Sequence, residues 1–466
     1  MMLPIRGMST SASEGVARLM AKLAAVRAIN KTRQNYFEAA QKTKHFGIAV
    51  PPHMVEFETT LSWAEKSCTH LNARINLDGF ALPDGELPDD VRRILRQNRL
   101  LSEAPMTHLE AEKYGPGFVI SLGGDVGEPA VVMRGLSART TTGEWNANAR
   151  RLTSILSITG AKWGRATEFI YADDEAVYTV AEGVRGLEVV HVDGVAMCPA
   201  SLLQFQPDLD NPFGRSRISH PVMRSIDRAQ RTLLRSEITA EFFSAPQRYL
   251  LGADEDIFVD ENGQPISSWD ALIGRINAIS RDQEGETPEI SYAPQVSMQP
   301  HTEMIRSDAA VFSSIVDLPV SVLGVVQDNP DSAEAMEVRW DALNKIAERA
   351  HVSFGAGWVD SIQKAVMIRD GLDDLPEELD DLEAVWRPAS QPTRQAAADA
   401  MTKEIAAMPW VAETEEALRG FGHSSRQIDR MLADRRRAQG GSTMAALIAA
   451  ASPAAPATAE NDVEER

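Results

Sequence analysis

The stretch SAEAMEVRWDALNKIAERAHVSFGAGWVDSIQKAVMIRD at residues 332–370 carries the longest helical periodicity in the chain. Apolar side chains recur in it at steps of three and four residues, which places them on one stripe of an α-helix. A helix of this length is roughly 60 Å long. A loop and an N-cap are predicted ahead of it at 328–332, and bending is predicted at Gly355 and Gly357. The apolar stripe comprises Met336, Trp340, Leu343, Ile346, Ala347, Ala350, Phe354, Trp358, Ile362 and Val366.

Two further helices precede the long one and enclose an insert. The periodicity predicts a helix over 217–243 and another over 301–316, which Pro319 ends because proline lacks the N–H that a helix needs. Residues 245–298 combine strand and helix patterns, so we expect a small α/β insert there. Within it we predict a strand at Asp256–Asp260 with a turn at Asn262-Gly263, a helix at Trp269–Ile279 and a strand at Glu289–Met298.

The helix predicted at 217–243 carries a basic stripe opposite its apolar one. At 100° per residue its arginines fall within about 60° of one another. A solvated helix face usually mixes charges of both signs, and this one does not. We therefore expect it to face an acidic protein surface or phosphate, and the sequence favours neither. The apolar stripe comprises Ile218, Val222, Ile226, Ala229 and Leu233, and the basic stripe comprises Arg217, Arg224, Arg228, Arg231 and Arg235.

The first quarter of the chain is predicted to be helical. Apolar periodicity indicates helices at 14–42, 54–74 and 89–103, and Pro51-Pro52 ends the first of these regions. Thr107 with Glu110 resembles a capping box for a further short helix.

Residues 116–210 predict an antiparallel β region built mainly from hairpins. β-Branched and aromatic residues alternate there with Gly, Asp and Asn, which favour turns. The glycine-rich stretch 123–127 lacks the spacing of a dinucleotide-binding loop and predicts a turn. The hairpins are predicted to join 118–122 with 130–133, 165–171 with 176–180, and 187–192 with 195–197, the last around Asp193-Gly194.

The C-terminal part is predicted to be an acidic loop followed by helices and a tail. Residues 371–384 favour a loop, and Trp386-Arg-Pro opens a helical region over 392–437 that breaks at Gly420–Gly422. Residues 415–432, followed by Arg435-Arg-Arg437, resemble a helix–turn–helix, although two packed helices with a solvated basic end fit the pattern better. The Gly-, Ala- and Pro-rich tail at 438–466 is predicted to be disordered.

Composition excludes several classes of protein. The chain has 466 residues, a net charge of −20 and ordinary globular contents of 43% hydrophobic and 24% charged residues. Such acidity excludes a generally basic nucleic-acid coat. Two cysteines, Cys68 and Cys198, exclude a disulfide framework and Cys-based zinc modules. No stretch of about 20 apolar residues predicts a membrane span, and Arg6 is not followed by the apolar core of a signal peptide.

No motif in the sequence predicts catalysis, a cofactor or a metal. The chain lacks a P-loop, an H-E-x-x-H pair and a G-x-S-x-G elbow. His191 with Asp193 offers two metal ligands, but no third ligand follows at a suitable spacing. We therefore expect no catalytic residue, no cofactor and no metal.

Several stretches, taken in order, resemble the portal proteins of siphovirus-type tailed bacteriophages. The resemblance covers about residues 25–440. It is carried by the five quoted stretches Asn35-Tyr-Phe37 with Gly47-Ile-Ala-Val-Pro-Pro52, Asn211-Pro-Phe-Gly-Arg-Ser-Arg-Ile218, Ser321-Val-Leu-Gly324 with Asn329-Pro-Asp-Ser-Ala-Glu-Ala335, Phe354-Gly-Ala-Gly-Trp358, and Trp386-Arg-Pro388.

The resemblance implies a helix-rich α+β subunit that assembles into a ring. It implies a channel loop with Gln327, Asp328 and Asn329 at a constriction. The implied parts are an N-terminal arm at 1–24, a wing at 25–215, a first stem helix at 216–244, a clip at 245–300, a second stem helix at 301–323, a tunnel loop and long tunnel helix at 324–370, a return to the wing at 371–393, a crown at 394–437 and the tail at 438–466.

The resemblance also implies a function that is not enzymatic. It implies a portal ring of twelve subunits at one capsid vertex, through which viral double-stranded DNA passes during packaging and ejection. Its partners are the terminase that hydrolyses ATP, the major capsid and scaffolding proteins, and head-completion or adaptor proteins. The implied location is the virion, after synthesis in the host cytoplasm and without a membrane partner.

Two other functions stay open at this point. One is an intracellular enzyme with a carboxylate site, because a pair of catalytic carboxylates has no sequence signature. The other is a DNA-binding regulator that uses residues 415–437.

Overall fold

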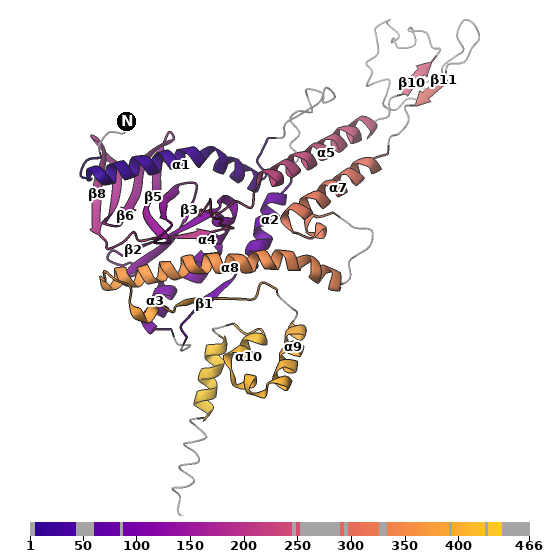
Figure 1. Ribbon diagram of the computed structural model, residues 1–466. Helices are drawn as coiled ribbons and strands as arrows, with labels where there is room; N and C mark the ends of the chain where they lie inside the picture. Colours follow the sequence, from indigo (N-terminus) through magenta and orange to yellow (C-terminus); the bar gives the residue numbers. More distant parts are fainter. Residues whose placement is uncertain are drawn as a thin grey trace, which may run out of the picture.

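The computed structural model describes residues 5–42, 60–83, 87–244, 248–251, 289–292, 297–325, 333–390, 394–424 and 427–439. Within these residues, sheets and helices form one body with two projections (Figure 1). One projection is the pair of helices α5 and α7, and the other is a group of short C-terminal helices. The prediction of a helix-rich α+β fold is confirmed.

The largest sheet is an antiparallel meander with the strand order β4-β5-β6-β7-β8. Helix α1 (Thr10–Phe37) lies across one face of this sheet (Figure 1), where Val16 and Leu19 pack with Phe169 and Tyr171. Consecutive strands pair throughout, so the predicted hairpin between 165–171 and 176–180 is confirmed. The strands are β4 (Thr141–Asn146), β5 (Arg151–Lys162), β6 (Arg165–Asp173), β7 (Ala176–Gly183) and β8 (Gly186–Gly194).

A second sheet joins segments that are distant in sequence. Strand β2 (Pro116–Gly123) lies between β3 (Val131–Ser137) and β9 (Ala200–Gln204), antiparallel to both. The β2–β3 hairpin is as predicted. The hairpin predicted at Asp193-Gly194 is wrong, because β8 ends at Gly194 and the chain crosses to the second sheet. Burial of Leu203 in β9 favours this crossing over a local turn.

Helix α4 (Leu100–Tyr114) packs on this second sheet, and α2 (Trp63–Asn72) and α3 (Asp89–Gln97) pack on α4. The helix predicted at 89–103 is in fact two helices, because Arg99 adopts a left-handed φ of 49°. The predicted capping box is also wrong. Thr107 lies inside α4, and its hydroxyl donates to the Glu103 carbonyl at 3.1 Å. Of the helix predicted at 54–74, residues 54–59 lie outside the described residues.

The long helix predicted at 332–370 packs on strands β2 and β9 of the second sheet. Helix α8 (Ala333–Asp370) runs unbroken through the two glycines where bending is predicted (Figure 1). A Cβ on Gly357 would lie 2.5 Å from the Leu202 carbonyl oxygen, so glycine is needed for close packing on β9 rather than for a bend. From Leu343 onward the predicted apolar stripe is confirmed by full burial of Leu343, Phe354 and Ile362, whereas the side chain of Met336 lies outside the described part of the structure.

Helices α5 (His220–Ser244) and α7 (Gln299–Val316) form a hairpin that projects from the body (Figure 1). At its far end β10 (Arg248–Leu251) pairs antiparallel with β11 (Glu289–Tyr292). This confirms the first part of the strand predicted at Glu289–Met298. The strand, turn and helix predicted between 256 and 279 lie outside the described residues.

The acidic segment after α8 is more regular than the predicted loop. Strand β12 (Glu383–Trp386) pairs antiparallel with β1 (Leu77–Ala81), so Trp386 ends a strand and does not open a helix. A short 3-10 helix, η4 (Glu377–Leu379), precedes it. Leu379 and Leu382 are buried among acidic neighbours and hold the segment on the body.

The C-terminal helices form their own small core. Helix α9 (Arg394–Ala407) is followed by the 3-10 helix η5 (Pro409–Glu413), by α10 (Glu415–Gly420) and by a helix over 427–439. Met401, Val411 and Ala417 pack together. Met401 and Val411 lie outside 415–432, so the two interpretations of that stretch both stay predictions. Residues 440–466, which include most of the predicted tail, lie outside the described residues.

None of the described helices is long and apolar enough to span a bilayer.

Candidate functional site

The α5/α7 hairpin carries the basic stripe predicted from the sequence, but the structure divides that stripe in two. Arg217 precedes α5, which begins at His220, and it is buried in the body. Arg224, Arg228, Arg231 and Arg235 lie on α5 itself, and all but the half-buried Arg231 are exposed. Including Arg217 in an exposed stripe was therefore wrong. The helix was predicted to begin at residue 217, three residues before α5 begins at His220.

Arg217 joins three elements at the root of the hairpin. Its Nε donates to the Ser67 carbonyl at 2.7 Å, and its Nη2 donates to the Val316 carbonyl at 2.6 Å. Its backbone N–H donates to the Glu112 carbonyl at 2.8 Å. The guanidinium thereby connects α2 with the end of α7, and the backbone N–H of the same residue connects both to the end of α4. Burial lowers its pKa from the ordinary arginine value.

The Glu112 side chain is fully buried at the same root. Asn72 Nδ2 donates to its Oε1 at 3.1 Å. Burial raises the pKa of this carboxyl to about 8, although the charge on Arg217 and the hydrogen bond from Asn72 oppose the rise. Glu112 is therefore mainly protonated at neutral pH. The root holds an arginine charge beside a carboxyl that is kept neutral by its surroundings.

Asp308 links the two helices of the hairpin. It lies on α7, its side chain is 1% exposed, and its Oδ1 is 2.5 Å from Arg228 Nε. Thr232 of α5 donates its hydroxyl to Asp308 Oδ2 at 2.8 Å. A buried carboxylate needs such partners, because its desolvation is costly when it is left alone. One arginine of the basic stripe is therefore already neutralised inside the subunit.

The hairpin is also tied to α1. Tyr36 donates its hydroxyl to Asp227 Oδ1 at 2.5 Å, and burial raises the pKa of this tyrosine above its usual range. Asp227 Oδ2 lies 3.9 Å from Arg224. The last turn of α1 therefore fixes the first half of α5 relative to the five-stranded sheet.

An aromatic group holds α8 against the body close to this root. His108 of α4 stacks on Phe354 with 4.8 Å between ring centroids. Its Nε2 accepts a hydrogen bond from Trp358 Nε1 at 2.8 Å. Full burial lowers the pKa of His108 to about 3, so this imidazole stays neutral in the folded chain. The arrangement fits a structural core histidine.

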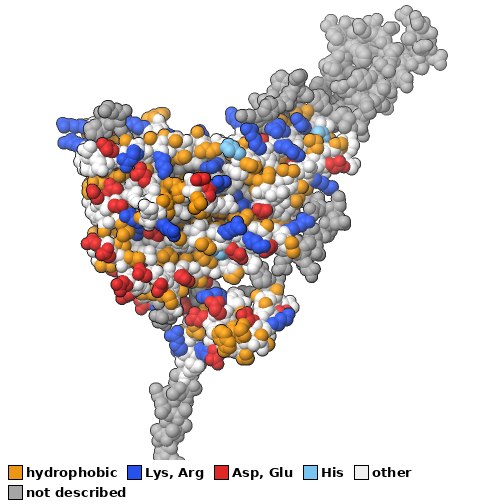
Figure 2. All heavy atoms as spheres, in the orientation of Figure 1, with side chains coloured by type: hydrophobic (Ala, Val, Ile, Leu, Met, Phe, Trp, Pro, Cys, Tyr) orange, Lys and Arg blue, Asp and Glu red, His pale blue; other side chains and the backbone are white. Residues whose placement is uncertain are grey.

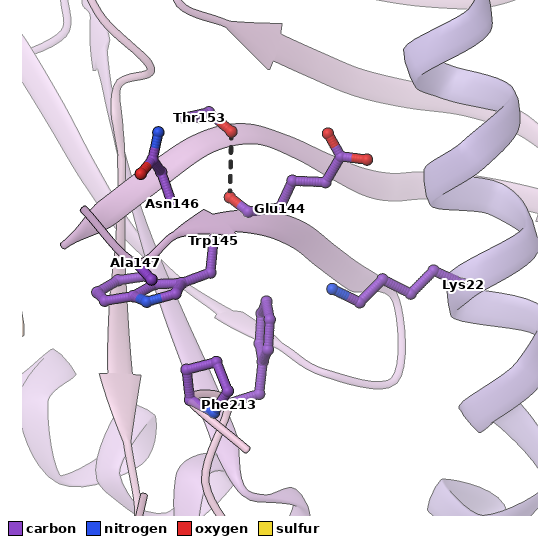
Figure 3. Close-up of a pocket in the computed structure, with 8 residues that line it drawn as sticks. Lys22, Glu144, Trp145, Asn146, Ala147, Thr153 and Phe213 are labelled. Carbon is purple, nitrogen blue, oxygen red and sulfur yellow. Dashed lines mark hydrogen bonds between the residues drawn. The ribbon is translucent and has the colours of Figure 1, made fainter. Parts of the chain in front are cut away.

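A hollow of about 550 Å³ lies between α1, β4 and the loop before α5 (Figure 3). Lys22 Nζ donates to the Gly143 carbonyl at 2.7 Å and lies 3.8 Å from the Phe213 ring centroid. Glu144 is the one carboxylate among the described lining residues, and Arg18 Nε donates to it at 3.0 Å. A paired-carboxylate site of the kind that an enzyme would need is not formed by this lining.

The remaining candidates from the sequence give no further site. His191 Nε2 lies 2.9 Å from Asp193 Oδ2 on exposed β8. Over the described part of the chain, no group of three His, Cys, Asp or Glu residues is placed to hold a metal. Gln327, Asp328 and Asn329, predicted at a channel constriction, lie outside the described residues. Arg435-Arg-Arg437 is exposed, and Arg437 pairs with Asp434 at 2.7 Å.

Asp308 and Glu112 were missed from the sequence, although each had a weak signal. Asp308 occupies an otherwise apolar position of α7, four residues before Phe312. Glu112 lies next to Lys113 near the end of α4. Neither position differs from an ordinary helix-surface carboxylate until α5 and α2 are packed against it.

Comparisons with known proteins agree over most of the chain. The portal protein of Mycobacterium phage L5 is 27% identical over 413 residues, covering 85% of this chain and 83% of that protein. The portal protein of Mycobacterium phage D29 is 27% identical over 417 residues, covering 86% and 84%.

Solved structures of a gene transfer agent are similar at a lower level. A chain of the native virion matches with a TM-score of 0.46 and 12% identity over 84% of this chain and 93% of that one. A chain of the neck of the empty particle, computed with C6 symmetry, matches with a TM-score of 0.47 and 11% identity over 84% and 92%.

The sequence profile described as "Phage portal protein, SPP1 Gp6-like" matches residues 53–441, which include both helices of the hairpin, the insert between them and the long helix α8. The chain belongs to this family of phage portal proteins.

Proposed function

We propose that this chain forms the ring-shaped portal of a phage capsid and that double-stranded DNA passes through its centre. The observation that carries the proposal is the family match over residues 53–441. The projecting α5/α7 hairpin with an insert at its far end supports it (Figure 1). In this proposal the hairpin is the stem, residues 245–300 are the clip, α8 is the tunnel helix and residues 394–437, from α9 onward, are the crown.

The other parts follow the family. Residues 25–215, from the second half of α1 through β9, are the wing, which meets the major capsid and scaffolding proteins. The clip meets terminase during packaging and head-completion or adaptor proteins afterwards. The chain itself acts as a conduit and hydrolyses nothing, so ATP hydrolysis belongs to the terminase. Its place is the vertex of the virion.

The acidity of the chain suits a conduit. A protein that binds phosphates tightly releases their counterions and is stabilised in place on the DNA, which would act as a brake. Twelve copies with a charge of −20 each carry about −240. Screening over about 8 Å limits the effect of this charge to the bore itself. The proposed constriction at Gln327, Asp328 and Asn329 is polar and slightly negative, in keeping with this requirement.

Native mass spectrometry tests the assembly. A species near twelve times the 51.0 kDa subunit mass supports the proposal. The measurement is made on the chain alone and on the chain produced together with its scaffolding protein. Both are needed because some portal proteins assemble into rings only with scaffolding protein. Monomers or dimers in both preparations would contradict a ring.

The channel role has its own test. Asp328→Lys in every subunit places a ring of cations at the proposed constriction, so packaging should slow or DNA retention should rise. The matched control is Asp373→Lys, which changes the same charge on the exposed segment after α8. Packaging and retention equal to those of the unchanged portal would remove the constriction from the proposal.

A further inference from the structure

The outer side of the α5/α7 hairpin combines a basic row with an apolar row. On α5 the exposed side chains of Arg224 and Arg228 retain 78% and 53% of their accessible surface. On α7 the apolar row is also exposed (Met304, Val311 and Ile315, between 38% and 44%). Figure 2 shows Lys and Arg side chains gathered over the hairpin beside hydrophobic ones. We call this surface, formed by Arg224, Arg228, Arg231, Arg235, Met304, Val311 and Ile315, the front of the hairpin.

Both rows lie on the same side of the hairpin. The ion pair between Arg228 and Asp308 crosses from α5 to α7 and marks the boundary where the two helices meet. At 100° per residue, Val311 and Ile315 lie within about 60° of Asp308 around α7. The arginines lie next to Arg228 around α5 in the same way. The two rows therefore flank one seam and form one continuous surface.

This combination fits a protein partner better than DNA. Phosphates would contact the arginines but would leave the apolar row exposed to water. A protein surface covers apolar side chains and places carboxylates opposite guanidinium groups at once. Arginine stems also pack well on apolar side chains of a neighbour while the charged head reaches a carboxylate.

The reverse side of α5 has the complementary charge. Glu237 and Glu241 are exposed, and they lie on average roughly 130° around the helix from the four arginines. In a ring, each subunit meets its neighbours through two different surfaces, because the contact is head-to-tail. A basic front and an acidic back on one hairpin are the pair of surfaces that such a contact needs.

We propose that the front of each hairpin packs against the back of the hairpin in the next copy of this chain, with Arg235 opposite the neighbour's acidic side at Glu237. The inference rests on the proposed ring and assigns its basic stripe to the subunit interface rather than to DNA. Arg224 and Arg228 pair with Asp227 and Asp308 of the same copy, whereas the carboxylate proposed to face Arg235 belongs to the neighbour.

Charge reversal with rescue tests the pairing. Arg235→Glu alone places like charges across every interface, and so does Glu237→Arg alone. Each single variant should weaken the affinity of one subunit–subunit contact about fivefold. The effect is repeated at every contact around the ring. The double variant restores opposite charges across the interface and should recover the ring fraction, measured by mass photometry at limiting concentration. Residues two apart do not face each other on a helix, so the rescue cannot arise within one copy.

Two further variants distinguish a specific effect at the interface from a general loss of folding. Val311→Asp should reduce the ring fraction, because it removes an apolar contact and adds a repelled or desolvated charge at the front. Lys403→Glu, an exposed change of the same charge on α9, should leave the ring fraction unchanged. Circular dichroism at the same concentration shows whether each subunit is still folded.

The outcomes distinguish this inference from the proposed function. Loss of rings in both single variants with recovery in the double variant supports it. Equal ring fractions in all of them, or a change in DNA retention without a change in ring fraction, would overturn it while leaving the portal function intact. Absence of rings from the unchanged chain, with and without scaffold, would instead contradict the portal function.

Discussion

The α5/α7 hairpin has a root, where Arg217 meets the body, and an outer half, beyond Arg228. Arginine and glutamate are buried in the first and exposed in the second. At the root, Arg217 is buried and bound to the Ser67 and Val316 carbonyls. In the outer half, Arg235 and Glu237 are exposed. The root therefore fixes the hairpin on the body, and the outer half is available to partners. Burial rather than sequence period decides which role an arginine has in this hairpin.

The largest effect on the free energy of unfolding is expected at Arg217. Replacing it in Arg217→Met removes two charge-assisted hydrogen bonds and leaves the Ser67 and Val316 carbonyls buried without this donor. We expect a loss of roughly 4 kcal/mol in the free energy of unfolding. Urea denaturation at one protein concentration measures it. The matched variant Arg235→Met should change stability by less than about 0.5 kcal/mol. Equal losses for the two variants would remove the distinction between root and outer half.

The next effect is the pH dependence contributed by Glu112. Its pKa rises from 4.5 to about 8 on folding, so the folded chain keeps a proton that the unfolded chain has released. The contribution to stability is therefore complete below about pH 4.5 and is lost as the pH rises towards 8. Glu112→Gln removes this loss and should stabilise the chain at pH 8, relative to pH 5, by on the order of 3 kcal/mol.

Thermal unfolding of the unchanged chain and of the Glu112→Gln variant between pH 5 and pH 8 measures this difference in stability. His108 acts in the opposite direction, because its pKa falls from 6.5 to about 3 and acid therefore favours the unfolded chain. This histidine is present in both forms and cancels from their difference. A difference that does not change with pH would show that the Glu112 carboxyl titrates normally.

A smaller effect is expected where the root passes into the outer half. Asp308→Asn keeps the shape of the side chain but removes the charge that partners Arg228 and weakens the acceptor for Thr232. We expect a loss of about 2 kcal/mol, because Arg228 is half exposed and water can replace part of the contact. The control is Glu303→Gln on the exposed side of the same helix. A loss no larger than that of the control would mean that Asp308 does not join the two helices.

The smallest effect is expected at Arg224. Its guanidinium is 3.9 Å from Asp227, and its side chain is 78% exposed. Arg224→Gln should change the free energy of unfolding by less than about 0.5 kcal/mol, since exposed ion pairs contribute little. The same urea measurement applies. A loss above 1 kcal/mol would show that exposure does not separate the contribution of Arg224 from that of the buried Arg217.

Much of the fold could be predicted because its signals are local. Leu343, Phe354 and Ile362 repeat at helical spacing, and β6 and β7 are joined by a short turn after Asp173. The errors occurred where distant segments compete with local patterns. Asp193-Gly194 has a turn sequence, yet β9 is drawn to β2 because Leu203 is buried there. Thr107 has a capping sequence, yet it lies within α4 and packs closely on Gly135 of β3.

The candidate site was predictable only in outline. The basic stripe was visible from spacing, but the sequence did not show that Ser216 and Arg217 bind the end of α4 before α5 begins. Once that contact forms, Arg217 is held at the root and cannot share the face of Arg224. The buried partner Asp308 is 80 residues after Arg228, across the insert, so no local pattern connects the two.

A cryo-EM reconstruction of the assembled chain would show directly whether the chain forms a portal ring. We expect a closed ring with a central channel wide enough for duplex DNA, with the α5/α7 hairpins side by side around it and the basic front of each on the next subunit. A closed assembly without a channel, or hairpins directed away from the axis without mutual contact, would contradict it.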